Sequence, residues 1–256
     1  MASVRNYTSL DPKYYMPVLS DLPALPEQAR AYEDVLSVQK NIMGSTVFGW
    51  TLERAKALKP DASQQFVCIA VGGDGVHEMA LARYGFDAVV VGNASVKNTV
   101  DLRNEYLYAE NEEVRTDEYL FAKGGMNGTM DFCEAGIRNI DSAFLENVCM
   151  GRELKVVMVH DNAFRQLDKD ALARFFKAVA NVASERAVLS ISFEPSEEGV
   201  STNETPIFNH RPRIIINMAH EANFIFAHKA SNMSAGQEVV EGLAFRLRQG
   251  HSAPRI

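Results

Sequence analysis

The sequence predicts an α/β fold with a mainly parallel sheet that ends in an antiparallel hairpin. Two observations support this prediction. Short apolar runs, each suited to a buried strand, alternate with helix-like stretches along much of the 256 residues. Near the C-terminus, the apolar runs RIIINMA (213–219) and FIFAHKA (224–230) are separated only by HEAN. So short a gap between two strands forces an antiparallel pair.

The first half of the chain begins with a segment that has no core of its own. Residues 1–25 are rich in proline, and we expect an arm that packs on a single domain formed by residues 26–256. Pro26 opens one predicted helix, and VFGWTLERAKALK (47–59) forms another. The continuous apolar run 66–71 is typical of a strand that is buried on both faces.

The next elements follow a glycine-rich turn. VHEMALARYG (76–85) predicts a helix that stops at its glycine, and 87–91 predicts the second strand. A third helix is expected over 96–114 and a short third strand over 118–122. Residues 129–147 are predicted to be helical in part.

The second half has clearer signals. LKVVMVH (154–160) predicts a buried strand, and DKDALARFFKAVANVA (168–183) predicts an amphipathic helix. RAVLSISFE (186–194) predicts the next strand, and a long polar loop follows over 195–212. The two strands of the hairpin complete the sheet.

Composition limits the functional classes. No N-terminal apolar segment indicates a signal peptide and no run is long enough to span a membrane, so we expect a cytoplasmic protein with no membrane partner. The net charge of −7 does not support a nucleic-acid partner, because phosphate contacts require basic side chains. The three scattered cysteines form neither a disulfide framework nor a zinc signature.

Two stretches resemble the class I S-adenosylmethionine-dependent methyltransferases. CIAVGGDGVHEMALARYGF (68–86) is similar to that family's strand, glycine loop and LA-containing helix. VVMVHDNAF (156–164) is similar to its fourth strand and the polar motif after it. The resemblance runs from about Phe66 to Ala230. It implies a three-layer sandwich around a seven-stranded sheet whose last strand is antiparallel, and a nucleoside cofactor at the glycine turn.

The resemblance also implies cofactor-binding residues. Glycines allow the backbone to approach a ligand, and ligands of open parallel sheets bind beyond the carboxyl ends of the strands. The loop KGGMNG (123–128) would cradle the adenine. The positions implied to bind S-adenosylmethionine are Gly72, Gly73, Asp74, Gly75, Asn93, Gly125, Met126 and Asp161.

The cofactor motif departs from the family's pattern at two acidic positions. Ile69 stands at one of them, and neutral Asn93 stands near the acid that ends the second strand. An amide binds a hydroxyl more weakly than a carboxylate does. The glycine turn therefore has two interpretations, a cofactor site and a tight turn that binds nothing.

The motif HDNAF supplies the candidate catalytic residues. His160 suits a general base because its ordinary pKa lies near neutrality, while Asp161 and Asn162 would orient the substrate or cofactor. Alternatively, His160 is a core histidine with a satisfied hydrogen bond, and Asp161 or Asn162 caps the next helix. Glu78 is interpreted as a first-turn acid favoured by the helix dipole. We expect no metal site.

The function that this sequence favours is methyl transfer from S-adenosylmethionine to an acceptor that the sequence does not specify. The alternative is a methyltransferase-like domain that has lost its cofactor and acts as a binding or assembly module. A nicotinamide-dependent oxidoreductase is a third hypothesis, and the antiparallel hairpin disfavours it. The sequence does not determine the oligomeric state.

Overall fold

The fold was analysed on a computed structural model of the chain. The structure describes residues 46–58, 65–73, 75–82, 85–93, 97, 100–101, 128–193, 207–234 and 237–248, some of them only by their backbone. The predicted arm, the helix that opens at Pro26 and the strand at 118–122 lie outside the described residues. Among the described residues, no helix combines the length and apolarity that are needed to cross a bilayer.

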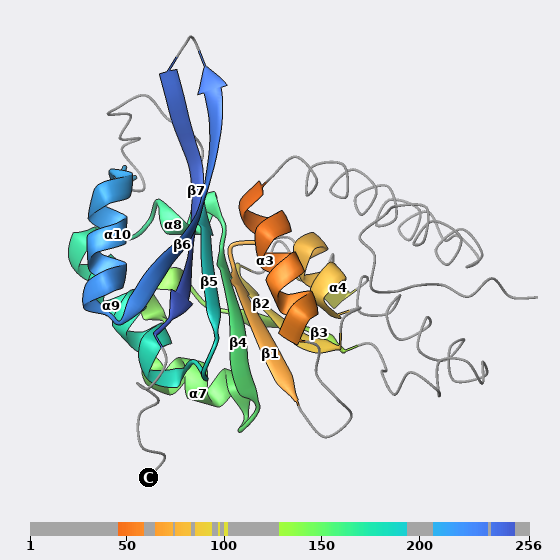
Figure 1. Cartoon of the computed structure of the whole chain (residues 1–256). Helices are drawn as coiled ribbons and strands as arrows, with labels where there is room; N and C mark the ends of the chain where they lie inside the picture. Colours follow the sequence, from red (N-terminus) through yellow and green to blue (C-terminus); the bar gives the residue numbers. More distant parts are fainter. Residues whose placement is uncertain are drawn as a thin grey trace, which may run out of the picture.

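Seven strands form one mixed sheet in the order β3-β2-β1-β4-β5-β7-β6 (Figure 1). The first five strands in that order are parallel, while β7 runs antiparallel to both β5 and β6. The predicted parallel neighbours and the antiparallel last strand are therefore confirmed. The strands are β1 (Phe66–Val71), β2 (Phe86–Gly92), β3 (Met130–Glu134), β4 (Glu153–Val159), β5 (Val188–Ser192), β6 (Phe224–Ser234) and β7 (Gln237–Leu247).

Helices cover both faces of the sheet, as a three-layer sandwich requires. In Figure 1, α7, α9 and α10 lie on one side of the sheet, and α3 and α4 lie on the other. The helical elements are α3 (Thr46–Leu58), α4 (Val76–Ala82), the 3₁₀ turn η3 (Ile137–Asn139), α7 (Ser142–Cys149), α8 (Asp161–Phe164), α9 (Lys169–Val182) and α10 (Pro212–Glu221).

The alternation of side chains along β1 divides the core into two halves. Val67, Ile69 and Val71 belong to a cluster with residues of α7, α9 and α10. Phe66, Cys68 and Ala70 point to the opposite face and pack with residues of α3 and α4. All six side chains of β1 are buried, which explains why this strand has no polar alternation.

The predicted hairpin exists, but it lies further along the chain than predicted. The run RIIINMA is helix α10, and the hairpin consists of β6 and β7. Pro212 occupies the first turn of α10, and its buried residues Ile215, Met218 and Ala219 follow helical spacing. His220 and Glu221 therefore end a helix rather than forming a hairpin turn.

Residues 129–147 are helical in part, as predicted, but they begin with strand β3 at the edge of the sheet, which was not predicted. The sequence MDFCE contains two acids and no continuous apolar run. This composition is tolerated because only Met130 of this strand is buried. Its neighbour β2 is paired in register from Ala88↔Met130 to Gly92↔Glu134. The helical part of this region is η3 and α7.

The cysteines are free thiols in the structure. Cys68 and Cys149 are buried and Cys133 is half-buried. Burial raises the pKa of Cys149 to about 11, so this thiol stays protonated at neutral pH.

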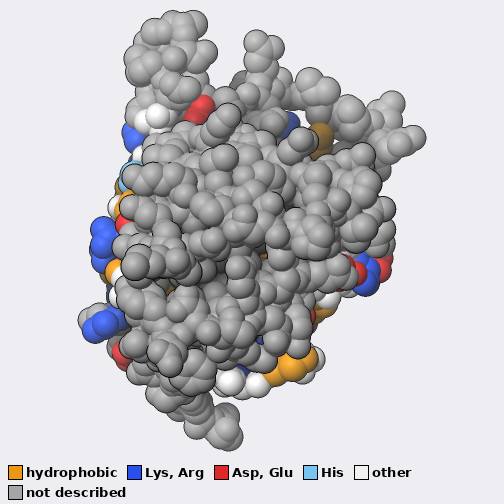
Figure 2. All heavy atoms as spheres, turned by 90° about the vertical axis from the view of Figure 1, so that its right-hand side faces the viewer, with side chains coloured by type: hydrophobic (Ala, Val, Ile, Leu, Met, Phe, Trp, Pro, Cys, Tyr) orange, Lys and Arg blue, Asp and Glu red, His pale blue; other side chains and the backbone are white. Residues whose placement is uncertain are grey.

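On the face shown in Figure 2, described basic and acidic side chains both appear along the rim, so charges of both signs border this face.

Asp168 caps the N-terminus of α9. The Asp168 carboxylate accepts a hydrogen bond from the Ala171 backbone N–H at 2.8 Å, and this bond, with help from Arg138 and Arg174, holds the pKa of Asp168 below its ordinary value of 3.8. The cap therefore stabilises the folded state fully above that ordinary value, and the contribution is lost as pH falls through the lower folded-state pKa.

We expect Asp168→Ala to lower the free energy of unfolding at about pH 7, and the difference from wild type to narrow at about pH 2. Urea unfolding at both pH values measures this. Asp168→Asn is the matched control, because an amide caps a helix without titrating. A difference between wild type and Asp168→Ala that does not change with pH would contradict the prediction.

Candidate functional site

A pocket opens at the carboxyl ends of the parallel strands. The chain leaves β1 toward β2 on one side and later enters β4 on the other, so the strand order reverses there. Such switch points are where open α/β sheets bind ligands. The pocket has a volume of about 380 Å³, within the range of small-molecule sites. Its lining is Val71, Gly72, Gly73, Val91, Gly92, Asn93, Glu134, Ala135, Gly136, Ile137, Ala163 and Gln166.

The glycine turn between β1 and α4 forms one wall of this pocket. Gly72 and Gly75 have φ angles of 81° and 88°, which side-chain-bearing residues rarely adopt. The Gly72 N–H donates to the Val91 carbonyl at 2.9 Å, which ties the turn to the end of β2. Asp74, between these glycines, lies outside the described residues.

Two polar residues from neighbouring strands also line the pocket. Asn93 follows β2 directly, and Glu134 ends β3. Gly92 pairs in register with Glu134, so the Asn93 and Glu134 positions are close along this edge. Glu134 was not predicted as a site residue, because strand β3 was not predicted from the sequence. The missing acid at the end of β2 is therefore accompanied by a carboxylate on the next strand.

The candidate catalytic motif begins where β4 ends. The His160 N–H donates to the Val71 carbonyl at 2.9 Å, so His160 lies level with the start of the glycine turn. Asp161 and Asn162 begin α8, and the structure describes their backbone but not their side chains. Gly125 and Met126, predicted to contact the adenine, lie outside the described residues.

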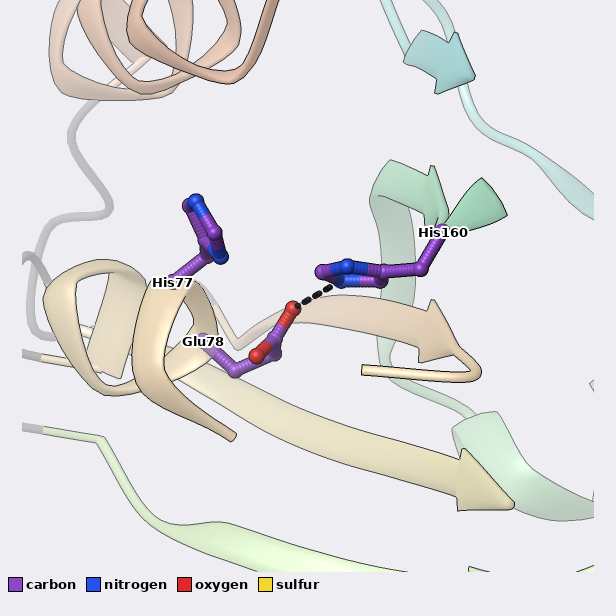
Figure 3. A group of neighbouring side chains, drawn as sticks. All are labelled: His77, Glu78 and His160. Atoms are coloured by element: carbon purple, nitrogen blue, oxygen red, sulfur yellow. Dashed lines mark hydrogen bonds and ion pairs between the residues drawn. The ribbon is translucent and has the colours of Figure 1, made fainter. Parts of the chain in front are cut away.

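The His160 ring points toward α4 and meets Glu78 and His77 (Figure 3). Its Nε2 lies 3.1 Å from Oε1 of Glu78. An ionised carboxylate only accepts hydrogen bonds, so the His160 Nε2–H is the donor. Phe48 of α3 packs on both imidazoles, with ring centroids 4.7 Å from His77 and 4.8 Å from His160.

Glu78 is in the first turn of α4, as expected, but its side chain is completely buried. Burial opposes its ionisation. The hydrogen bond from His160 and the charges of His160 and His77 outweigh that effect, so the pKa of Glu78 lies below its ordinary value. A buried carboxylate that stays ionised needs positive or hydrogen-bonding partners, and here the histidines provide them.

Gly73 lies between this cluster and the pocket. It lines the pocket, and a Cβ atom on it would lie 2.5 Å from Nε2 of His160. That separation is shorter than real contacts allow, so the absence of a side chain at position 73 lets the His160 ring reach Glu78. The contact between position 73 and the His160 ring was not predicted from the sequence.

Sequence reasoning missed this group of three residues, although it had a usable signal. His77 and Glu78 follow β1, His160 follows β4, and 82 positions separate Glu78 from His160. Because β1 and β4 are parallel neighbours, residues just beyond their carboxyl ends meet at one edge of the sheet. The two motifs, one after each of these strands, are therefore the signal in the sequence that indicates the cluster.

Comparisons with known proteins return structural similarity alone. No protein-family model and no curated protein matches the chain. The chain is similar to magnesium protoporphyrin IX methyltransferase from Synechocystis PCC 6803 with bound SAH, at 16% identity and a TM-score of 0.48, over 95% of this chain and 98% of that one. It is also similar to a SAM-dependent methyltransferase from Methanosarcina mazei, at 13% identity and a TM-score of 0.47, over 75% and 96%.

With TM-scores below 0.5, these matches assign neither the fold nor an activity. The fold assignment rests on the strand order and on the antiparallel β7. The strand order and the antiparallel β7 define a Rossmann-like, seven-stranded mixed sheet, which is the arrangement that the sequence resemblance implied.

Proposed function

We propose that this chain binds S-adenosylmethionine in the pocket at the ends of β1, β2 and β3 and transfers its methyl group to an acceptor. The main support for this proposal is the location of the pocket in the sheet and the residues that line it. It lies at the switch point of the sheet, and its lining includes glycines of the turn together with the polar residues Asn93 and Glu134.

The residues present suit a nucleoside ligand. Glu134 offers a carboxylate that accepts hydrogen bonds from sugar hydroxyls, and Asn93 offers both a donor and an acceptor beside it. Gly72 and Gly73 expose backbone to the ligand without side chains in the way. The resemblance adds Asp74, Gly75, Gly125 and Met126 to this set. Ile69 takes no part, because it is fully buried within β1.

The end of β4 supplies the acceptor side of the proposed reaction. A bound S-adenosylmethionine would supply an electrophilic methyl group. Asp161 and Asn162 are the residues that we assign to orienting the acceptor. Glu78 holds the His160 ring by its Nε2–H. In the neutral form of the ring, Nδ1 is then the nitrogen that accepts a proton from the acceptor. Catalysis of this kind depends mainly on positioning.

Thermal unfolding with and without ligand tests the proposal. A ligand present at about 100 times its dissociation constant stabilises the folded state by about 2.7 kcal/mol, which is visible as a raised melting temperature. We expect S-adenosylmethionine and its demethylated product to raise the melting temperature, and calorimetry to show one site per chain.

A nicotinamide dinucleotide is the control ligand, and it should leave the melting temperature unchanged. Stabilisation by the dinucleotide alone would favour the oxidoreductase hypothesis. No shift and no heat of binding with millimolar S-adenosylmethionine would overturn the proposal and favour a module without a cofactor.

A further inference from the structure

Three metal-binding side chains meet beside the pocket. His77 and Glu78 come from the first turn of α4, and His160 comes from the end of β4, on the neighbouring strand to β1 (Figure 3). One ligand atom from each residue lies within 4.8 Å of the others. Two imidazoles and one carboxylate thus converge from two separate segments of the chain.

The Glu78 carboxylate is the second, independent observation. The residue is completely buried, and its Oε1 receives the hydrogen bond from His160. Its other oxygen, Oε2, is buried and has no hydrogen-bond partner among the described residues. A buried carboxylate oxygen without a donor is costly, because it has lost water and gained nothing in return. A cation bound to the carboxylate would remove that cost.

The ligand set selects the class of cation. Magnesium and calcium prefer oxygen ligands, whereas imidazole suits zinc, iron, copper and nickel. Two histidines and one glutamate are a known catalytic zinc set, in which water or substrate takes a fourth position. Ligand atoms about 2.0–2.1 Å from a tetrahedral zinc ion lie about 3.4 Å apart. The 3.1 Å between Glu78 Oε1 and His160 Nε2 is close to this distance, and a bound metal ion would replace the Nε2 proton, which is released to solvent. The upper bound of 4.8 Å for the other separations requires only a small side-chain movement.

We propose that His77, Glu78 and His160 bind a divalent transition-metal ion, for which zinc is the probe, with at least one coordination position left for water or a ligand. The two histidines are half-buried, so the cluster is not sealed. Gly73 lies between the cluster and the pocket, because it lines the pocket and its Cα faces the His160 ring. The proposal goes beyond methyl transfer and does not depend on it, because metal binding can be measured without S-adenosylmethionine.

The test uses the full chain without a histidine tag, stripped with a chelator and dialysed. Calorimetric titration with zinc should give one site per chain, and zinc should raise the melting temperature. Glu78→Gln keeps the shape of the side chain and removes its charge. We expect it to weaken zinc binding by more than about 100-fold, since even groups that only support a ligand are worth 10–100-fold. His77→Asn should weaken binding as well, and it removes a half-buried ring.

His220→Ala is the matched control, because His220 is an exposed histidine at the end of α10. It should bind zinc as wild type does. Circular dichroism and the metal-free melting temperature show whether each variant is folded. X-ray absorption of the zinc-loaded protein should show nitrogen and oxygen ligands without sulfur.

The proposal is overturned by wild type that binds no zinc, by folded Glu78→Gln and His77→Asn variants that bind it with wild-type affinity, or by sulfur ligation from a cysteine. If zinc binds and S-adenosylmethionine does not, the metal site stands and the proposed function fails. If S-adenosylmethionine binds and zinc does not, the metal site is wrong and the proposed function stands.

Discussion

Gly136→Phe is expected to abolish binding of S-adenosylmethionine while leaving the fold intact. Gly136 lines the pocket between β3 and η3, and a Cβ atom at this position would meet no heavy atom within 4 Å. Its backbone φ of −82° and ψ of 147° is extended conformation that any residue adopts. A large side chain is therefore tolerated by the protein and occupies space that the ligand needs. We expect a loss of at least about 100-fold in affinity, or about 2.7 kcal/mol.

Calorimetry and the ligand-induced rise in melting temperature measure this effect. Asn139→Phe is the matched control, because Asn139 is exposed, lies three residues further along and does not line the pocket. It should bind like wild type. If Gly136→Phe folds and retains wild-type affinity, the ligand binds elsewhere and the assignment of this pocket is wrong.

Gly128→Ala is expected to have the largest effect on stability. A Cβ atom at Gly128 would lie 1.9 Å from the backbone oxygen of Phe86 and 2.4 Å from its carbonyl carbon. The obstacle is backbone at the start of β2, so no side-chain rotation relieves it. The Gly128 N–H also donates to the Ala82 carbonyl at 2.7 Å, which fixes the approach of β3. We expect the free energy of unfolding to fall by about 3 kcal/mol or more, which is the upper end of the range for overpacked sites.

Urea unfolding monitored by circular dichroism measures this loss. Gly136→Ala is the control, because the same methyl group enters open space there and should change the free energy of unfolding by less than about 0.5 kcal/mol. Equal effects of the two substitutions would show that the close contact at Gly128 does not limit stability.

The parallel part of the sheet could be predicted because its apolar runs fit only one kind of element, a buried strand. The runs of β1 and β4 are continuously apolar, and such runs form strands buried on both faces. Helix α9 was equally clear, since its buried residues follow helical spacing after the capping Asp168. Local physics alone accounts for these elements.

Two elements could not be predicted from local patterns. The run in α10 has the composition of a strand, and its contacts with α9 and β6 are what bury Ile215, Met218 and Ala219 on one helical side. Strand β3 is half-exposed at the sheet edge, so its acids are tolerated and its apolar signal is weak. In both cases the partners that bury the element are distant in sequence.

The candidate site also has one part that the sequence predicts and one part that depends on the tertiary structure. The sequence by itself determined that a glycine turn follows β1 and that His160 follows β4, because each stands at the end of an apolar run. Only the tertiary structure decided that Glu134 joins Asn93 at the pocket and that His160 meets Glu78 across Gly73. The physical reason is strand order: side chains 82 positions apart become neighbours when β1 and β4 pair, and no local pattern records which strands will pair.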